Sequence, residues 1–223
     1  MKRLLSLLTF ILLNNIIMAQ DTAPISFLAL GDSYTIGESV SETERWPVQL
    51  AADLVERGYS VKSPKIIAKT GWRTDELMDA INADEQLAES YDLVSLLIGV
   101  NNQYQGKTVT SYEPEFEALL VKAIELAGGD ADRVFVVSIP DYGKTPFGKE
   151  KREQIEVAID KYNEVNKFFA KKYGVKYFNI TPISRRAAFQ ENLVASDGLH
   201  PSGEMYTEWV DLMISKVARM LKK

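Results

Sequence analysis

Short apolar runs alternate with longer amphipathic stretches from residue 25 to the C-terminus. The apolar runs predict buried β-strands at residues 25–30, 66–68, 93–98, 134–139 and 175–180. Apolar residues at helical spacing predict helices over residues 46–56, from Thr74, after Thr110, over a long stretch ended by Gly174, and over 205–220. Strands separated by helices predict a parallel sheet covered on both faces, a three-layer α/β/α sandwich with five strands.

Two of the predicted helices have clear sequence signals at their starts. Thr74 precedes two acidic residues and opens a helix whose apolar face runs to Leu87. Thr110 and Glu113 have the spacing of a capping box before another helix. Since neither an internal repeat nor a linker interrupts the pattern, residues 20–223 are expected to form a single domain.

The first nineteen residues have the layout of a secretory signal peptide. Lys2 and Arg3 form a basic start, residues 4–13 are mostly apolar, and Ala19 offers a small residue for cleavage. The apolar stretch is short for a membrane span, although an uncleaved anchor is the alternative interpretation. We therefore expect residues 1–19 to be removed on export to the periplasm or the medium, with no stable membrane insertion afterwards.

Composition excludes several classes of function. The formal net charge is −5 and no basic cluster occurs within the chain, so binding to nucleic acid is not expected. Cysteine is absent, which excludes disulfides, thiol nucleophiles and thiolate metal sites. The single histidine excludes a multi-histidine metal site, and any imidazole chemistry must use His200.

Glycine and polar residues cluster where the predicted strands end. In a parallel α/β sheet, ligands bind beyond the C-terminal ends of the strands. Four segments carry such residues: Gly-Asp-Ser-Tyr at 31–34, Lys-Thr-Gly-Trp at 69–72, Gly-Val-Asn-Asn at 99–102 and Asp-Gly-Leu-His-Pro-Ser at 197–202. The first three follow predicted strands and the fourth precedes the last helix, so one pocket is expected to collect them.

Three side chains in these segments are suited to nucleophilic catalysis. Asp197 lies three residues before His200, so its carboxylate can orient the imidazole and leave the other nitrogen to accept a proton. Ser33 follows a buried strand and supplies a hydroxyl at the sheet edge. The alternatives are a turn-forming Asp197 beside a surface histidine, and a helix N-cap role for Ser33.

Two further residues are suited to stabilising a developing negative charge. Gly71 permits close approach of its backbone N–H, and Asn101 carries an uncharged amide donor. A serine at a helix start also directs its backbone N–H groups toward an incoming oxyanion. A turn glycine and a loop asparagine are the alternatives for Gly71 and Asn101.

Taken together in this order, the four segments resemble the SGNH, or GDSL, hydrolase superfamily of esterases, lipases and lysophospholipase-like enzymes. The resemblance implies a flavodoxin-like α/β/α fold and an ester hydrolase that uses neither metal nor cofactor. It implies that Ser33 is the nucleophile, His200 the base and Asp197 the orienting carboxylate. The oxyanion hole would then consist of the backbone N–H groups of Ser33 and Gly71 with the amide of Asn101. The third segment departs from the family, which commonly has Asp where this chain has Asn102.

The substrate is less clearly indicated than the reaction. Aromatic side chains that follow the strands are candidates for substrate binding or for local packing: Tyr34, Trp72, Tyr104 and Tyr142. The polar residues 102–109 are a candidate rim or lid. Small acyl esters, acetylated carbohydrates and lysophospholipids all fit as small-molecule substrates. Acyl transfer by the same residues and a non-catalytic exported binding module are the alternative functions.

Overall fold

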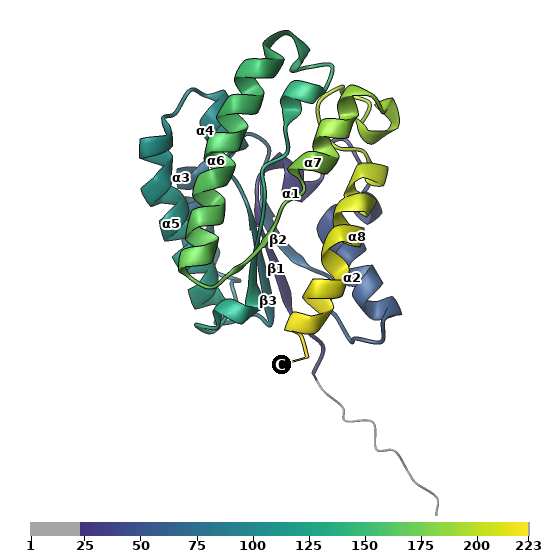
Figure 1. Cartoon of the computed structure of the whole chain (residues 1–223). Helices are drawn as coiled ribbons and strands as arrows, with labels where there is room; N and C mark the ends of the chain where they lie inside the picture. The colour runs from purple at the N-terminus through teal and green to yellow at the C-terminus, as the bar shows by residue number, and fades with distance from the viewer. Residues whose placement is uncertain (1–22, 223) are drawn as a thin grey trace, which may run out of the picture.

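The computed structural model describes residues 23–222 and arranges them around one parallel β-sheet (Figure 1). Its five strands pair in the order β2-β1-β3-β4-β5, and every pair is parallel. The strands are β1 (Phe27–Gly31), β2 (Lys65–Ala68), β3 (Leu93–Leu97), β4 (Val134–Val137) and β5 (Lys176–Phe178). Each coincides with a predicted apolar run to within two residues at either end. The predicted α/β fold is therefore confirmed.

Helices cover both faces of the sheet. The α-helices are α1 (Ser33–Ile36), α2 (Trp46–Glu56), α3 (Thr74–Ala83), α4 (Val100–Tyr104), α5 (Val109–Leu126), α6 (Arg152–Lys172), α7 (Thr181–Ser184) and α8 (Gly203–Met220). Short 3-10 helices occur at η1 (Glu42–Glu44), η2 (Ala131–Arg133), η3 (Tyr142–Lys144), η4 (Lys149–Lys151), η5 (Arg185–Ala188) and η6 (Glu191–Leu193). In Figure 1, α2 and α8 lie together on one side of the sheet and α3, α5 and α6 on the other.

The sheet is held by apolar burial on both faces. Every residue of β1 and β3 is buried. Trp46, at the start of α2, is fully buried, and its ring centroid lies 6.3 Å from that of Phe27 and 6.2 Å from that of Phe135. Burial of a side chain of this size stabilises a fold by roughly 1.5–3 kcal/mol. The central strands therefore form a rigid base for the loops that follow them.

Two predicted helix boundaries are wrong. Helix α3 ends at Ala83, because Asp84 begins a turn in which its carboxylate accepts from the backbone N–H of Gln86 at 2.8 Å. Leu87 therefore packs against the core from a turn and not from the helix. Helix α5 begins at Val109, and its N-cap is Thr108, whose hydroxyl accepts from the backbone N–H of Ser111 at 3.1 Å. This local bond displaces the capping box predicted at Thr110.

Helix α4 occupies the first part of the segment interpreted as a polar rim or lid. The chain turns from β3 into α4 through Gly99, which has a φ of +124°. A Cβ at this position would lie 2.5 Å from the hydroxyl of Tyr112, so only glycine fits the turn. The tight turn places Asn101 and Asn102 in the first helical turn beyond the sheet edge.

The predicted signal peptide, residues 1–19, lies outside the described residues. Between residues 23 and 222, none of the helices combines the length and the apolar character that a membrane crossing requires.

Candidate active site

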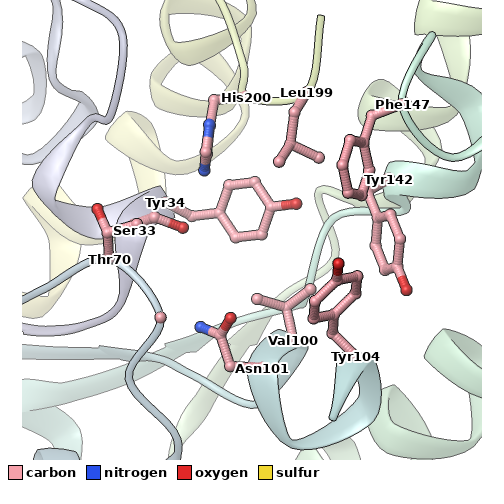
Figure 2. Close-up of a pocket in the computed structure, with 11 residues that line it drawn as sticks. Ser33, Tyr34, Thr70, Val100, Asn101, Tyr104, Tyr142, Phe147, Leu199 and His200 are labelled. Carbon is pink, nitrogen blue, oxygen red and sulfur yellow. The ribbon is translucent and has the colours of Figure 1, made fainter. Parts of the chain in front are cut away.

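The ends of β1, β2 and β3 and the loop before α8 meet around one cavity of about 180 Å³. Its lining residues are Ser33, Tyr34, Thr70, Gly71, Val100, Asn101, Tyr104, Tyr142, Phe147, Leu199 and His200. In Figure 2, Ser33, His200 and Asn101 surround one end of the cavity, and three aromatic rings form the other. The structure thus brings the four segments singled out in the sequence to one place.

Ser33 is the first residue of α1 and lies two residues beyond the end of β1. The N-cap of α1 is Asp32, whose Oδ1 accepts from the backbone N–H of Tyr34 at 3.0 Å. Because Asp32 caps the helix, the hydroxyl of Ser33 is not needed for that purpose. Ser33 is largely buried, and its side chain lines the cavity.

Asp32 itself is fully buried behind the helix start. Among the described residues, its Oδ2 atom has no hydrogen-bond partner. Burial raises the pKa of this carboxyl from 3.8 to about 7, against the smaller lowering effect of the bond from Tyr34. The first segment of the motif therefore carries a titratable group in the neutral pH range that does not line the cavity.

Asp197 and His200 form a hydrogen-bonded pair within a single turn. Asp197 Oδ2 lies 2.6 Å from His200 Nδ1, and Asp197 Oδ1 accepts from the backbone N–H groups of Leu199 and His200 at 2.9 and 3.0 Å. Gly198, with a φ of +72°, closes the turn. With Nδ1 engaged, Nε2 is the imidazole nitrogen that faces the cavity (Figure 2).

The carboxylate of Asp197 is held in its charged form. Partial burial acts to raise its pKa, but hydrogen bonds from Ser39, from the His200 ring and from two backbone N–H groups outweigh this effect. The net result is a pKa well below the usual range for aspartate. A carboxylate that stays ionised in this way stabilises a neighbouring imidazolium.

Ser33, Gly71 and Asn101, which line the same cavity as His200, carry candidate hydrogen-bond donors. Gly71 adopts a φ of +87° beyond β2. Within residues 23–222, neither its backbone N–H nor that of Ser33 donates to any acceptor. The amide nitrogen of Asn101 donates one hydrogen to the carbonyl of Trp72 at 2.9 Å, which leaves its second N–H. The bond to Trp72 thus fixes the orientation of the Asn101 amide beside Gly71.

Three of the four aromatic residues singled out in the sequence line the cavity, namely Tyr34, Tyr104 and Tyr142. Trp72 is not among the lining residues and takes part only through its carbonyl. Burial raises the pKa of the Tyr34 hydroxyl well above its ordinary value and that of Tyr142 to about 12, so both phenols stay protonated at neutral pH.

Sequence reasoning missed two residues at this site. Phe147, which follows η3, completes the aromatic end of the cavity, and its backbone N–H donates to the carbonyl of Gly198 at 3.0 Å. Ser39 donates its hydroxyl to Asp197 at 2.6 Å. Neither residue lies in a recognisable motif, and Phe147 is distinguished only as an aromatic residue after a predicted strand.

No cluster of three or more His, Asp and Glu side chains within residues 23–222 has the arrangement of a metal site. A serine, an Asp–His pair and candidate N–H donors around one cavity at the carboxyl edge of a parallel sheet are the kind of arrangement that serine hydrolases use.

Comparison with known proteins agrees with this class. The sequence model of the GDSL-like lipase/acylhydrolase family matches residues 29–207. The chain belongs to this family and is an ester hydrolase. A search of curated proteins found no match.

Solved structures show the same fold at low sequence identity. The lipase/acylhydrolase from Enterococcus faecalis is 19% identical with a TM-score of 0.69, covering 87% of this chain and 96% of that one. The psychrotrophic esterase EstA from Pseudoalteromonas sp. is 16% identical with a TM-score of 0.66, covering 89% and 99%. Phospholipase A1 from Streptomyces albidoflavus NA297 is 18% identical with a TM-score of 0.64, covering 87% and 100%. At these identities, the likeness establishes the fold.

Proposed function

We propose that the protein is an exported serine esterase that cleaves carboxylic esters with short acyl groups. In this proposal Ser33 is the nucleophile, His200 the general base and Asp197 the carboxylate that orients the imidazole. The observation that carries it is the 2.6 Å contact between Asp197 Oδ2 and His200 Nδ1 beside a cavity that Ser33 also lines. Family membership as an ester hydrolase supports the same reaction.

The reaction proceeds in two stages, acylation and deacylation, and His200 accepts and returns a proton in each. The oxygen of Ser33 attacks the ester carbonyl carbon while His200 Nε2 takes the hydroxyl proton. The tetrahedral intermediate collapses, His200 returns the proton to the leaving alcohol, and an acyl group remains on Ser33. Water then attacks the acyl-enzyme with His200 again as base, and His200 returns this proton to the Ser33 oxygen as the carboxylic acid leaves. Asp197 stays ionised throughout because its pKa lies well below the usual range.

The negative charge of each tetrahedral intermediate falls on the former carbonyl oxygen. The backbone N–H groups of Ser33 and Gly71 and the second N–H of Asn101 are the donors that receive it. Two of the three belong to the backbone, and the bond to the Trp72 carbonyl holds the third in place. Donors fixed before the reaction stabilise the transition state without reorganisation.

The shape of the cavity supports a short acyl group. The rings of Tyr104, Tyr142 and Phe147 close its far end, with centroids 6.1, 6.1 and 6.3 Å apart. Tyr142 is fixed by a hydrogen bond from its hydroxyl to Gln103 at 2.9 Å. A wall of packed rings limits the length of chain that reaches Ser33 from this side, so simple short-chain esters and acetylated carbohydrates fit better than lysophospholipids.

A covalent probe tests the nucleophile directly. A fluorophosphonate should label the wild-type protein on the peptide that contains Ser33, as read by mass spectrometry. Ser33→Ala should abolish labelling and lower kcat for p-nitrophenyl acetate by a factor on the order of 10⁶. Ser90→Ala, at an exposed serine outside the cavity, is the matched control and should behave as wild type. Labelling that persists in Ser33→Ala contradicts the proposal.

Export is tested separately. Full-length protein produced in a bacterial host should appear outside the cytoplasm with a new N-terminus near Gln20, as read by N-terminal sequencing. Retention of Met1 in the exported fraction contradicts cleavage of residues 1–19.

A further inference from the structure

Ser39 has an unusual backbone conformation. It lies three residues beyond α1 and is the one non-glycine residue within residues 23–222 that has a positive φ, at +67°. Residues with a Cβ avoid this region because the side chain crowds the backbone. Such a conformation persists where the surrounding contacts hold it.

The hydroxyl of Ser39 bonds to the carboxylate that orients His200. Ser39 Oγ donates to Asp197 Oδ2 at 2.6 Å, across 158 positions of sequence. The same oxygen lies 2.6 Å from His200 Nδ1. The other hydrogen bonds to Asp197 come from within its own turn. Among the described residues, Ser39 is thus the one group outside that turn that holds the carboxylate.

The segment of residues 37–39 also connects to the nucleophile. The backbone N–H groups of Gly37 and Glu38 donate to the carbonyl of Ser33 at 3.1 and 3.0 Å. The carboxylate of Glu38 accepts from the hydroxyl of Thr70, which precedes Gly71. The segment therefore links the Ser33 carbonyl, the loop that carries Gly71 and the carboxylate of Asp197.

We propose that Ser39 is a positioning residue for the esterase reaction. Its hydroxyl fixes the carboxylate of Asp197, which in turn holds the His200 imidazole in its orientation toward Ser33. The inference rests on the proposed function. The turn that carries Asp197 and His200 is joined to the nucleophile by the Ser39 hydroxyl and by the backbone bonds from residues 37 and 38 to the Ser33 carbonyl. The strained backbone of Ser39 places the hydroxyl within reach of Oδ2, and a glycine there would give the same turn without the donor.

Two substitutions separate this role from that of an ordinary turn residue. Ser39→Gly removes the hydroxyl and relieves the backbone strain, whereas Ser39→Ala removes the hydroxyl and keeps the strain. If Ser39 only shapes the turn, Ser39→Gly is at least as stable and as active as wild type. If its hydroxyl positions Asp197, both variants lose about tenfold in kcat with little change in KM, while Ser39→Gly keeps or raises the melting temperature.

A spectroscopic measurement follows the contact without any substrate. His200 is the single histidine of the chain, so imidazole-¹⁵N labelling gives one Nδ1–H signal with no assignment problem. Ser39→Gly should shift this proton resonance or broaden it, because the carboxylate that accepts the proton has lost a partner. Ser41→Gly makes the same change two residues away, at a serine that bonds to Glu44, and should leave the resonance unchanged.

The outcomes distinguish the two proposals. If fluorophosphonate fails to label the wild-type protein, the proposed function fails. If wild type labels and Ser39→Gly retains more than a third of its kcat with an unshifted resonance, the role of Ser39 is overturned. A loss of threefold or more in kcat in both Ser39 variants, together with the shifted resonance and wild-type behaviour of Ser41→Gly, supports it.

Discussion

Asn102 holds Thr74 through both ends of its carboxamide. Its Oδ1 accepts from the backbone N–H of Thr74 at 3.1 Å, and its Nδ2 donates to the Thr74 hydroxyl at 2.6 Å. Asn102 is buried, and its neighbour Asn101 donates to the carbonyl of Trp72. Consecutive amides of α4 therefore fix the loop between β2 and α3, which carries Gly71. One of the two is turned toward the cavity, and the other serves the framework.

This division predicts different losses for the two asparagines. Asn101→Ala should lower kcat by roughly 10²–10³, about 3–4 kcal/mol, with little change in KM, because its amide acts mainly in the transition state. Asn102→Ala should lower the free energy of unfolding by about 1–3 kcal/mol, because it leaves buried partners unpaired, and should reduce kcat much less. Steady-state kinetics and urea unfolding of both variants check this. A larger kcat loss at Asn102 contradicts the assignment.

The structure also explains why this chain carries Asn102 where the family commonly has aspartate. Glu115 accepts from the Thr74 hydroxyl and from Asn102 Nδ2 at 3.3 Å. An aspartate at position 102 would place a second carboxylate against Glu115, and the two would compete for the single Thr74 hydroxyl. The amide adds a second donor to this glutamate beside the Thr74 hydroxyl.

We therefore expect Asn102→Asp to destabilise the protein by about 1–3 kcal/mol at neutral pH. Adding Glu115→Gln should restore most of this loss, because the donor and acceptor are then exchanged between the two positions. Urea unfolding of the two single variants and the double variant measures the coupling. Additive losses in the double variant contradict a direct interaction between these side chains.

Asp32 predicts a pH-dependent stability. Its pKa is about 7 in the folded protein, above the ordinary value of 3.8, so the folded state binds a proton that the unfolded state has released. The free energy of unfolding should therefore fall as the pH rises from about 4 to about 7. In Asp32→Asn this contribution is absent, while the new side chain still accepts from Tyr34.

The measurable quantity is the stability difference between Asp32→Asn and wild type. From pH 4.5 to pH 8, the free energy of unfolding of Asp32→Asn should rise by about 3 kcal/mol relative to that of wild type. Any effect of the buried amide that does not depend on pH cancels in this comparison. Urea unfolding at these two pH values provides the test. A difference that is independent of pH would show that Asp32 is charged in the folded protein throughout this range.

The aromatic wall predicts a change in acyl preference. Tyr104, Tyr142 and Phe147 also border a second hollow of about 360 Å³ on their other side, whose remaining lining residues include Gln103, Lys151 and Gln154. Truncating both exposed rings, in Tyr104→Ala with Phe147→Ala, should join this hollow to the cavity beside Ser33.

The expected result is a roughly tenfold rise in the ratio of kcat/KM for p-nitrophenyl octanoate to that for the acetate. The enlarged cavity makes room for several methylene groups of the octanoate chain. Each contributes up to about 0.8 kcal/mol when it is fully buried, and because only part of the chain is buried, the expected total is a roughly tenfold effect. Phe189→Ala removes an aromatic ring that is 91% exposed and lines neither hollow, so its ratio should stay at the wild-type value. An unchanged ratio in the double variant means that the acyl chain does not run toward the wall.

Local sequence was enough for the fold and for the central pair of the site. The apolar runs identified all five strands, since a buried parallel strand needs a continuous apolar stretch wherever it lies. The pairing of Asp197 with His200 was also predictable, because the two residues lie three positions apart and a glycine turn brings their side chains together. The strand-end positions of Ser33, Gly71 and Asn101 followed from the rule that parallel strands end at one edge.

Packing between distant segments decided the rest. The contact of Ser39 with Asp197 spans 158 positions, and that of Asn102 with Thr74 spans 28. The choice of Phe147 over Trp72 as a cavity wall depends on how the loop after β4 folds back toward the turn of His200. The raised pKa of Asp32 comes from burial. No local pattern encodes these features, because each depends on which surfaces meet when the helices close over the sheet.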